Sequence, residues 1–327
     1  MSDYSELIQY FVKAKDIAVF MHVNPDGDCI SSSLALCIFL KKKGKNVFCV
    51  SPNFDKESIN EKFRFLPHFD MIGSRDFLDQ FDLCAGVDLG DAGRLGDKNV
   101  LRVFNRGKNT VVIDHHAEHI DFAKYTVRES DSASTTQILY KILKQYDEKS
   151  IDKDVATCLY AGLITDSGCF SYPNASPETL RIGADLIEYG IDAAEIVRRV
   201  MKDEPKRVFD LKNKVLSKAK FYQEGIAVIT FSREDYDATG CTERDTEGLI
   251  NNILNVSGVE LAISMSEFKG DVYRVSWRSK HNVNAAACAK AFGGGGHFNA
   301  AGCRVYGEFD EAYERVLAVA KEMISYV

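Results

Sequence analysis

The sequence predicts an α/β protein with an N-terminal domain built on a parallel sheet with flanking helices, a helical linker, and a smaller C-terminal α/β domain. Short apolar runs over residues 17–21, 81–87 and 109–113 have the length and composition of buried strands. Helical patterns over residues 30–38 and 132–146 alternate with these runs. Strands and helices that alternate in this way are typical of a parallel sheet covered by helices.

The first strand leads into a polar turn and then a helix. His22, Asp26 and Asp28 follow the apolar residues 17–21 within a stretch of seven residues. A proline and a glycine between them favour a tight turn, and the next apolar residues recur at helical spacing up to Gly44, which ends the helix. Taken alone, the stretch also fits an ordinary polar turn in which Asp28 only caps the helix.

The rest of the N-terminal domain continues the alternation. The second of the three strands ends in Asp88, and the third ends in the run Asp114-His115-His116. Another apolar segment, a helix or a buried stretch, precedes Asp166. The other elements expected here are a strand at 46–50, irregular chain at 51–80 with short helical pieces near 57–65 and 75–80, the apolar segment at 155–163 and a helix at 177–189.

A charged helical segment, residues 192–220, is expected to link the two domains, which then span residues 1–191 and 221–327. The C-terminal domain alternates strands and helices again. Its expected strands lie near 226–231, 259–268 and 271–279, and its expected helices lie near 247–254, 284–292 and 309–326.

Composition narrows the class of protein. The 327 residues include 45% hydrophobic and 27% charged residues, which is normal for a globular protein of two domains. The net charge of −7 argues against a binder of long nucleic acid, which needs a broad basic surface. We find neither a secretory leader nor an apolar run long enough to span a membrane, so cytoplasmic residence is expected. The nine cysteines form no CxxC pair and are expected to be reduced, buried side chains.

The polar residues that follow the predicted strands have the chemistry of metal ligands. They are expected to converge, because the carboxyl ends of parallel strands lie at one edge of a sheet. Carboxylates that come close repel one another unless a cation lies between them, and imidazole with carboxylate suits a divalent transition metal. The expected cluster contains His22, Asp26, Asp28, Asp88, Asp114, His115 and His116, with Asp166 joining from the segment after residue 163.

The order of these motifs resembles a known family. His22-Val-Asn-Pro-Asp26-Gly-Asp28, Asp88, Asp114-His115-His116 and Thr165-Asp166 resemble the DHH phosphoesterase superfamily, which is named for its Asp-His-His run. Arg278-Ser-Lys, followed by Phe292-Gly-Gly-Gly-Gly-His297 and Asn299-Ala-Ala-Gly, resembles the associated DHHA1 domain. The resemblance covers nearly the whole chain, and its two-domain length looks most like the nanoRNase / pAp phosphatase branch.

The resemblance implies a two-metal hydrolase that most often uses manganese, with zinc or iron as alternatives. His22 and Asp26 would hold one metal ion, and Asp88 would bridge both ions. The second ion would be held by Asp28, His115 and Asp166. Asp114 would orient a histidine and His116 would face the substrate phosphate, so that the residues implied in catalysis are Asp88, Asp114, His115 and His116.

The C-terminal motif is expected to bind the substrate. Arg278 offers a bidentate fork to a terminal phosphate, and His297 would donate to a phosphate. A run of glycine N–H groups also binds phosphate oxygens, although no Gly-Lys-Ser/Thr follows as in a Walker A motif. The alternative for the glycines is a flexible loop between a helix and a strand. The residues implied in substrate binding are Arg278, Ser279, Gly294, Gly295, Gly296, His297 and Asn299.

The expected activity is hydrolysis of very short RNA (a nanoRNase, or exonuclease of oligoribonucleotides) to mononucleotides, together with removal of a phosphate from 3′-phosphoadenosine-5′-phosphate (pAp) and similar nucleotides. A linear or cyclic dinucleotide phosphodiesterase is the alternative within the same class, and a non-catalytic nucleotide-binding regulator ranks below both. Partners are therefore short RNA and small phosphorylated nucleotides, without long duplex nucleic acid or membranes. A homodimer is left open.

Other polar residues receive ordinary roles. His68, His119 and His281 are expected at the surface. Asp91 and Arg94 lie where a helix cap or a substrate contact would fit, and the cap is favoured. Thr165 is left open between a supporting role in the site and a helix end.

Overall fold

The computed structural model describes residues 3–52, 59, 61–73, 80–246 and 248–324. The chain divides into two compact units, Met1–Asp203 (unit 1) and Glu204–Val327 (unit 2). The three-part division predicted from the sequence, with a linker at 192–220, stays a prediction. Of the irregular region expected at 51–80, the helical piece near 75–80 lies almost wholly outside the described residues.

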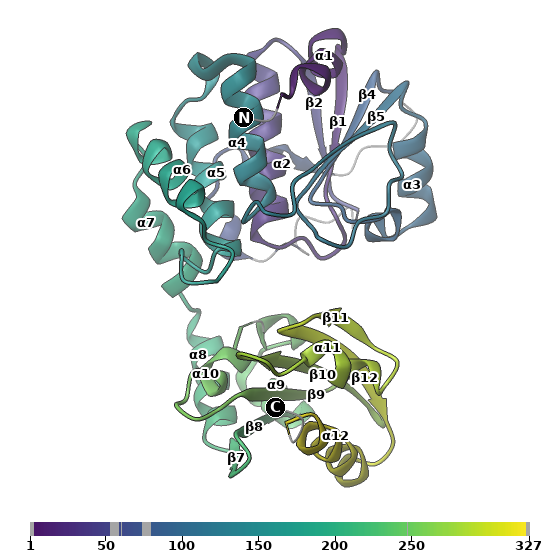
Figure 1. The fold of residues 1–327 in the computed structure, drawn as a ribbon, viewed down its shortest axis with the longest axis vertical. Coiled ribbons are helices and arrows are strands. Elements are labelled where there is room, and N and C mark those ends of the chain that lie inside the picture. The colour runs from purple at the N-terminus through teal and green to yellow at the C-terminus, as the bar shows by residue number, and fades with distance from the viewer. Residues whose placement is uncertain (1–2, 53–58, 60, 74–79, 247, 325–327) are drawn as a thin grey trace. The chain divides into compact units, whose positions relative to one another are not determined.

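Unit 1 contains the predicted parallel sheet (Figure 1). The strand order is β3-β2-β1-β4-β5-β6, and every neighbouring pair is parallel. Two strands, β3 and β6, were not predicted because they are short and carry little apolar pattern. The strands are β1 (Asp16–Phe20), β2 (Asn46–Val50), β3 (Ile72–Gly73), β4 (Leu83–Val87), β5 (Asn109–Asp114) and β6 (Tyr125–Arg128).

The helices of unit 1 include those predicted over residues 30–38, 132–146 and 177–189, and a short helix at 61–63 lies within the piece expected near 57–65. The apolar segment at 155–163, left open between helix and buried stretch, is part of α5, whereas α1 and α3 were not predicted. The α-helices are α1 (Ser5–Lys13), α2 (Gly27–Lys42), α3 (Lys98–Asn105), α4 (Thr135–Asp147), α5 (Lys153–Asp166), α6 (Pro177–Glu188) and α7 (Ala193–Val197). Short 3-10 helices are η2 (Glu61–Phe63), η3 (Phe69–Met71), η4 (Ala92–Leu95) and η5 (Glu148–Ser150), and η6 (Arg198–Lys202) is a π-helix.

Helices cover both faces of this sheet, with α2, α4 and α5 on one side and α3 on the other (Figure 1). The side chains of β1 alternate between the two faces of the sheet. Ile17 and Val19 belong to the hydrophobic core on the face covered by α2, α4 and α5. Phe20 instead packs on Phe104 of α3, with ring centroids 5.3 Å apart. A sheet that is buried on both faces leaves its strand ends as the place where polar side chains reach one another.

Unit 2 contains a mixed sheet in the order β11-β12-β10-β9-β8-β7, in which only the pair β8–β9 is parallel among the described strands. The predicted strands are present, whereas β7, β11 and β12 were not predicted. The strands are β7 (Lys220–Tyr222), β8 (Ile226–Phe231), β9 (Leu261–Glu267), β10 (Val272–Ser279), β11 (Gly295–His297) and β12 (Ala300–Tyr306). The helices are α8 (Lys206–Leu216), α9 (Arg233–Thr239), η7 (Glu243–Thr246), α10 (Ile250–Leu254), α11 (Ala285–Lys290) and α12 (Phe309–Ile324).

The two faces of the second sheet differ. On one face, side chains such as Ile263, Val275 and Trp277 form a core with α11 and α12. On the other face, helices α8, α9 and α10 cover β8 and β9, where Ile229 is buried. The side chains of β10 and β12 that point to this second face alternate with buried ones and are partly or fully exposed, as at Arg274. One face of the unit 2 sheet is therefore only half covered by the unit itself.

Two further expectations concern the whole chain. All nine cysteines are free and eight of them are buried, as predicted. Within the described residues, the helices lack the length and apolar character that a membrane crossing demands.

Candidate metal centre

The turn after β1 brings the first predicted ligands to the end of the sheet. Asp26 is the N-cap residue of α2, and its Oδ1 accepts a hydrogen bond from the Cys29 N–H at 3.1 Å. The cap of this helix is therefore Asp26, and the alternative in which Asp28 caps it is wrong. Asp28 lies in the first turn of α2 with its side chain fully buried.

The N-terminus of α4 holds the Asp28 carboxylate. The N–H groups of Thr135 and Thr136 donate to Asp28 Oδ2 and Oδ1 at 2.6 and 3.0 Å. The Thr136 hydroxyl donates to Oδ1 at 2.8 Å. Helix α5 crosses this point at Gly162, where a Cβ atom would lie 2.5 Å from Thr136 Cγ2 and 2.9 Å from Asp28 Oδ1. The absence of a side chain at Gly162 thus lets three segments meet around one carboxylate.

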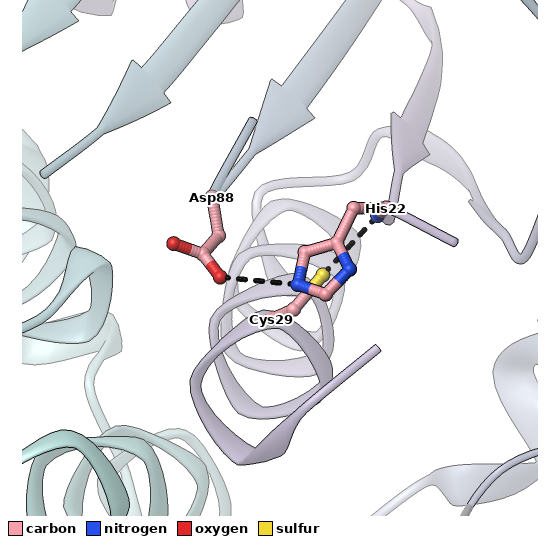
Figure 2. Close-up of side chains that lie close together, drawn as sticks. All are labelled: His22, Cys29 and Asp88. Atoms are coloured by element: carbon pink, nitrogen blue, oxygen red, sulfur yellow. Dashed lines mark hydrogen bonds and ion pairs between the residues drawn. The ribbon is translucent and has the colours of Figure 1, made fainter. Parts of the chain in front are cut away.

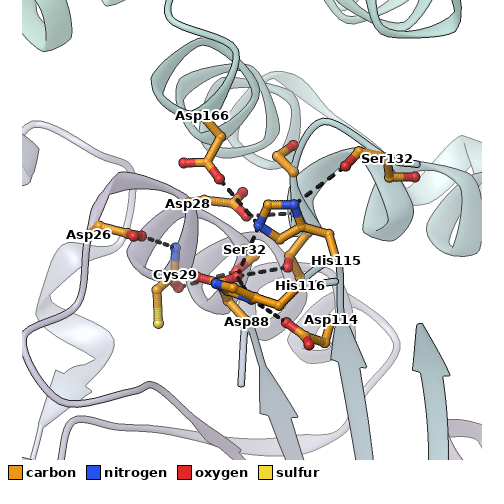
Figure 3. A network of polar contacts seen from close by, with 12 residues as sticks. Asp26, Asp28, Cys29, Ser32, Asp88, Asp114, His115, His116, Ser132 and Asp166 are labelled. Carbon is orange, nitrogen blue, oxygen red and sulfur yellow. Dashed lines mark hydrogen bonds and ion pairs between the residues drawn. The ribbon is translucent and has the colours of Figure 1, made fainter. Parts of the chain in front are cut away.

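Asp88 lies between two histidines, His22 (Figure 2) and His115 (Figure 3). Its Oδ2 is 3.4 Å from His22 Nε2, and its Oδ1 is 3.5 Å from His115 Nε2. The residue has a φ of +59°, a strained conformation for a side-chain-bearing residue, and its N–H donates to the Ile113 carbonyl of β5 at 2.9 Å. The backbone at the end of β4 is therefore bent so that one carboxylate faces both imidazoles.

Both of these imidazoles turn Nδ1 toward a backbone carbonyl and Nε2 toward the carboxylates. His22 Nδ1 is 2.8 Å from the Val23 carbonyl, and His115 Nδ1 is 3.4 Å from the Ser132 carbonyl. A ring nitrogen that donates to a carbonyl leaves the lone pair on the other nitrogen, as in most metal-bound histidines. The His22 Nε2 atom is buried and has no hydrogen-bond partner within the part of the chain that the structure describes. That orphaned atom, with carboxylate oxygens around it, fits a bound cation.

Asp166, at the end of α5, completes the group. Its Oδ2 is 3.3 Å from His115 Nε2, so the residue joins the cluster as predicted, from a helix end and not from a strand. Asp28, His115 and Asp166 each have a ligand atom within 4.8 Å of the others, as do Asp88, His115 and His116. All six predicted ligands therefore lie together, the sixth being Asp26, whose Oδ1 is 3.8 Å from His22 Nε2.

The carboxylates of this cluster are crowded. Burial, followed by the charge of Asp88, raises the pKa of Asp28 to about 7. Burial and the charge of Asp28 also raise the pKa of Asp166 well above its usual range. Carboxylates that repel one another to this degree either share protons or are neutralised by a cation, so the electrostatics agree with the orphaned His22 nitrogen.

His116 differs from the other two histidines because both of its ring nitrogens have protein partners. Its Nδ1 is 2.7 Å from Asp114 Oδ1, and its Nε2 accepts from Arg94 Nη1 at 2.7 Å. Burial alone would lower the pKa of His116, but the Asp114 carboxylate raises it overall. Asp114, which is fully buried, also accepts from His119 Nδ1 at 2.7 Å. His22 and His115 thus direct Nε2 at the carboxylates of the cluster, whereas His116 is held between Asp114 and Arg94.

Two expectations about the surrounding residues need revision. The surface position expected for His119 is wrong, because its side chain is only 2% exposed and contacts Asp114. Asp91 is the cap of η4, as favoured, but Arg94 is not a cap, because its guanidinium contacts His116. Thr165 donates to the Gly162 carbonyl within α5 and its side chain also borders Gly27, so both of its expected roles stay open. His68 and His281 are exposed, as expected.

From the sequence, Cys29 was expected only to be a buried apolar side chain. Its Sγ accepts a hydrogen bond from the His22 N–H at 3.3 Å and lies within 4.8 Å of ligand atoms of His22 and Asp88 (Figure 2). Its position next to Asp28 in the motif was the signal that it would border the cluster. Burial, the largest influence, raises the pKa of the Cys29 thiol to about 11.

The residues predicted to bind substrate lie together on unit 2. Arg278 of β10 and His297 of β11 are each directly opposite Ala300 of β12, so they occupy one line across three strands. The loop alternative for the glycine run is right only in part, because Gly295 and Gly296 belong to strand β11, whereas Gly293 and Gly294 lie in the connection between α11 and β11. Gly296 has a φ of +146°, and a Cβ atom there would lie 2.5 Å from the Ala300 carbonyl oxygen. The close approach of β11 to β12 therefore requires glycine.

Ser279 and Asn299 have structural partners. The Ser279 hydroxyl donates to the Val283 carbonyl at 2.6 Å, and its N–H donates to the Asn299 carbonyl at 3.1 Å. The Asn299 Nδ2 in turn donates to the Ser279 carbonyl at 3.2 Å. These two side chains therefore fix the end of β10, where Arg278 lies.

Fold and site together define a two-unit α/β protein with a histidine–carboxylate centre at the carboxyl edge of a parallel sheet. Residues 16–163 match the DHH family, N-terminal domain, and residues 224–325 match the DHHA1 domain. The chain belongs to this DHH family, so the resemblance seen in the motifs is confirmed.

Known proteins resemble the chain over nearly its full length. It is 32% identical to the bifunctional oligoribonuclease and PAP phosphatase NrnA of Thermus thermophilus, over 98% of this chain and 94% of that protein. It is 24% identical to the NrnA of Bacillus subtilis, over 96% of each chain. The crystal structure of an exopolyphosphatase-related protein from Bacteroides fragilis superposes with a TM-score of 0.89 and 27% identity, covering 98% of this chain and 96% of that one.

Proposed function

We propose that this protein is a metal-dependent phosphohydrolase that degrades short oligoribonucleotides to mononucleotides and dephosphorylates pAp-like nucleotides. The observation that carries the proposal is the meeting of six ligand-type side chains from separate segments, with the Asp88 carboxylate between His22 and His115. The names of the Thermus and Bacillus relatives, which describe both activities, support the choice of substrates.

In this proposal His22 and Asp26 hold one divalent cation, and Asp28, His115 and Asp166 hold a second. Asp88 would serve both positions, in keeping with its two short distances to different histidines. A mixed set of imidazoles and carboxylates suits Mn²⁺, with Zn²⁺ or Fe²⁺ as alternatives. Bound as a pair, the ions supply a hydroxide at neutral pH and stabilise charge on the attacking and leaving oxygens.

The side chains beside the cluster orient the substrate. Asp114 accepts from His116 Nδ1 and so holds the ring in one orientation, in which His116 faces the substrate phosphate. Arg94 adds a permanent positive charge at the same place, because its guanidinium lies against His116 Nε2. His119 supports the arrangement from behind by donating to the second oxygen of Asp114.

Unit 2 supplies the grip on the substrate. Arg278 offers its guanidinium to a terminal phosphate, and His297, Gly295 and Gly296 lie on β11, which β12 separates from β10. The Gly294 N–H, which the sequence assigned to the substrate, donates instead to the Ala289 carbonyl at 3.0 Å. Ser279 and Asn299 keep the end of β10 in place through their mutual hydrogen bonds. The net charge of −7 of the whole chain is in line with small anionic nucleotides, and not long RNA, as substrates.

The test is a panel of pAp, a dinucleotide RNA and a cyclic dinucleotide, each incubated with Mn²⁺, Mg²⁺, Zn²⁺, Fe²⁺ or EDTA. The proposal expects turnover of the first two substrates with Mn²⁺ and none with EDTA. Preferred turnover of the cyclic dinucleotide would instead support the cyclic-dinucleotide phosphodiesterase. Tight nucleotide binding without turnover in any metal would identify a non-catalytic regulator.

A further inference from the structure

A pair of arginines on unit 2 lies apart from the residues predicted to bind substrate. Arg274 of β10 and Arg304 of β12 are directly opposite each other in the antiparallel pair. Both guanidinium groups lie over the ring of Phe268, 5.5 and 5.3 Å from its centroid. Like charges directly opposite one another repel across a sheet, so the pair concentrates positive charge at this point of the surface.

The positive charge of the pair is only partly compensated. Arg274 Nη1 is 3.2 Å from Glu243 Oε2, and the Arg274 side chain is still half exposed. Among the residues that the structure describes, no carboxylate is within ion-pair distance of Arg304, which is also exposed. One positive charge therefore remains available to an anion at the surface of the sheet.

The two arginines line a pocket of about 460 Å³. Its lining also includes the exposed Tyr306, Phe292, whose ring stacks on Trp277, and the glycines Gly293 and Gly294. The volume lies in the usual range for small-molecule pockets. Aromatic rings beside arginines are the means by which proteins bind single-stranded nucleic acid, since bases stack on the rings and phosphates contact the guanidinium groups.

We propose that this pocket is a second nucleotide subsite, which binds an oligoribonucleotide beyond the nucleotide held at Arg278; the proposal rests on the proposed function. Arg274 and Arg278 point to the same face of β10 and are four residues apart, about 13 Å along a strand. An oligonucleotide that extends along the strand contacts both arginines, whereas pAp contacts only the site at Arg278. The subsite thus favours oligonucleotides over pAp.

The test compares a variant that carries Arg274→Ala and Arg304→Ala with the control Arg233→Ala, which removes an exposed arginine of α9 outside the pocket. The measured quantity is the ratio of kcat/KM for pentaadenylate to kcat/KM for pAp. We expect the ratio to fall about tenfold in the double variant, through KM, because the variant can neither pair with the phosphates nor support base stacking in the pocket. In the control we expect no change.

Binding gives an independent readout. The affinity for labelled pentaadenylate, measured in EDTA at several salt concentrations, should depend less steeply on salt in the double variant, by about 0.7 in the logarithmic slope for each phosphate that an arginine no longer neutralises. An unchanged ratio and slope would overturn the subsite, as would equal losses on pentaadenylate and pAp. Absence of turnover of any substrate by the unmodified protein would refute the proposed function, and the binding data would still decide on the subsite.

Discussion

The two sheets of this protein carry their polar side chains in different places. In unit 1 both faces of the sheet are buried, and the polar residues His22 and Asp88 come directly after the strands. In unit 2 the exposed or half-buried side chains of β10, such as Arg274 and Arg278, alternate with buried ones along the strand. A sheet that is covered on both faces has its polar groups together at the strand ends, an arrangement that suits small cations. A half-covered face has them distributed along its strands, an arrangement that suits an extended anion.

The largest effect that this comparison predicts is at the cluster of ligand side chains at the edge of the unit 1 sheet. Asp88→Asn should lower kcat at least about 1,000-fold on both pAp and a dinucleotide, because it removes the charge shared between His22 and His115. Calorimetry should show loss of Mn²⁺ binding to the same protein. Asp131→Asn, at an exposed position, is the matched control and should bind Mn²⁺ and turn over substrate normally. Full Mn²⁺-dependent hydrolysis by Asp88→Asn would refute the shared-ligand role.

A substitution on the half-covered face of the unit 2 sheet should have a different effect. Arg278→Ala should raise KM for both substrates about 10- to 150-fold, the cost of losing charge-assisted hydrogen bonds to a phosphate. Mn²⁺ binding should be unaffected, because Arg278 belongs to the other compact unit. The two units would not have separate roles if Arg278→Ala weakened Mn²⁺ binding as much as it weakened substrate binding. Arg233→Ala serves as the control for loss of one positive charge from unit 2.

The same contrast explains which parts of the site were predictable from the sequence. The residues after β1, β4 and β5 were found because a run of buried residues followed by His or Asp is a local signal. Strand β12 was not found, because Gly302 and Arg304 interrupt its apolar pattern, and the pairing of Arg304 with Arg274 was therefore hidden as well.

The contacts around Asp114 were not predictable for another reason. His119 and Arg94 gain their roles only because buried polar groups require partners and the fold brings these two side chains to Asp114 and His116. Nothing in the spacing of His119 or Arg94 along the chain distinguishes them from exposed residues. Such residues become visible only once the buried group that needs them has been located.

A moderate loss of activity is expected where the cluster of ligand side chains in unit 1 depends on close packing. Gly162→Ala places a Cβ atom 2.5 Å from Thr136 and 2.9 Å from Asp28 Oδ1, so the start of α4 must shift away from the carboxylate. We expect kcat to fall about tenfold, as is typical when groups that orient a metal ligand are displaced. In Gly73→Ala the new Cβ meets no atom within 4 Å among the residues that the structure describes, so this control should keep its activity. Equal activity of the two variants would show that α5 does not position Asp28.

The smallest expected effect is a difference in the free energy of unfolding between the metal-free and the Mn²⁺-loaded protein. The pKa of Asp28, raised by burial and by Asp88, is about 7 in the folded protein, against 3.8 for a free side chain. The folded state therefore binds more protons than the unfolded state between these values, and the stability of the metal-free protein falls as the pH rises from about 4 to 7. A bound cation removes the repulsion that causes this loss, so its stabilising effect should be larger at pH 7.5 than at pH 5.

Calorimetry at both pH values measures this difference. With Mn²⁺ at about 100 times its Kd, stabilisation of about 2.7 kcal/mol should raise the Tm of unit 1 by about 5–10 °C at pH 7.5, and by less at pH 5, where protons compete for the ligands. Hydrogen exchange assigns the effect to a unit, because the N–H groups of Thr135 and Thr136 bond directly to Asp28 and should exchange more slowly with metal. Amides of β10 should not change. Equal protection in both units, or a Tm shift that does not depend on pH, would contradict a cation site confined to the edge of the first sheet.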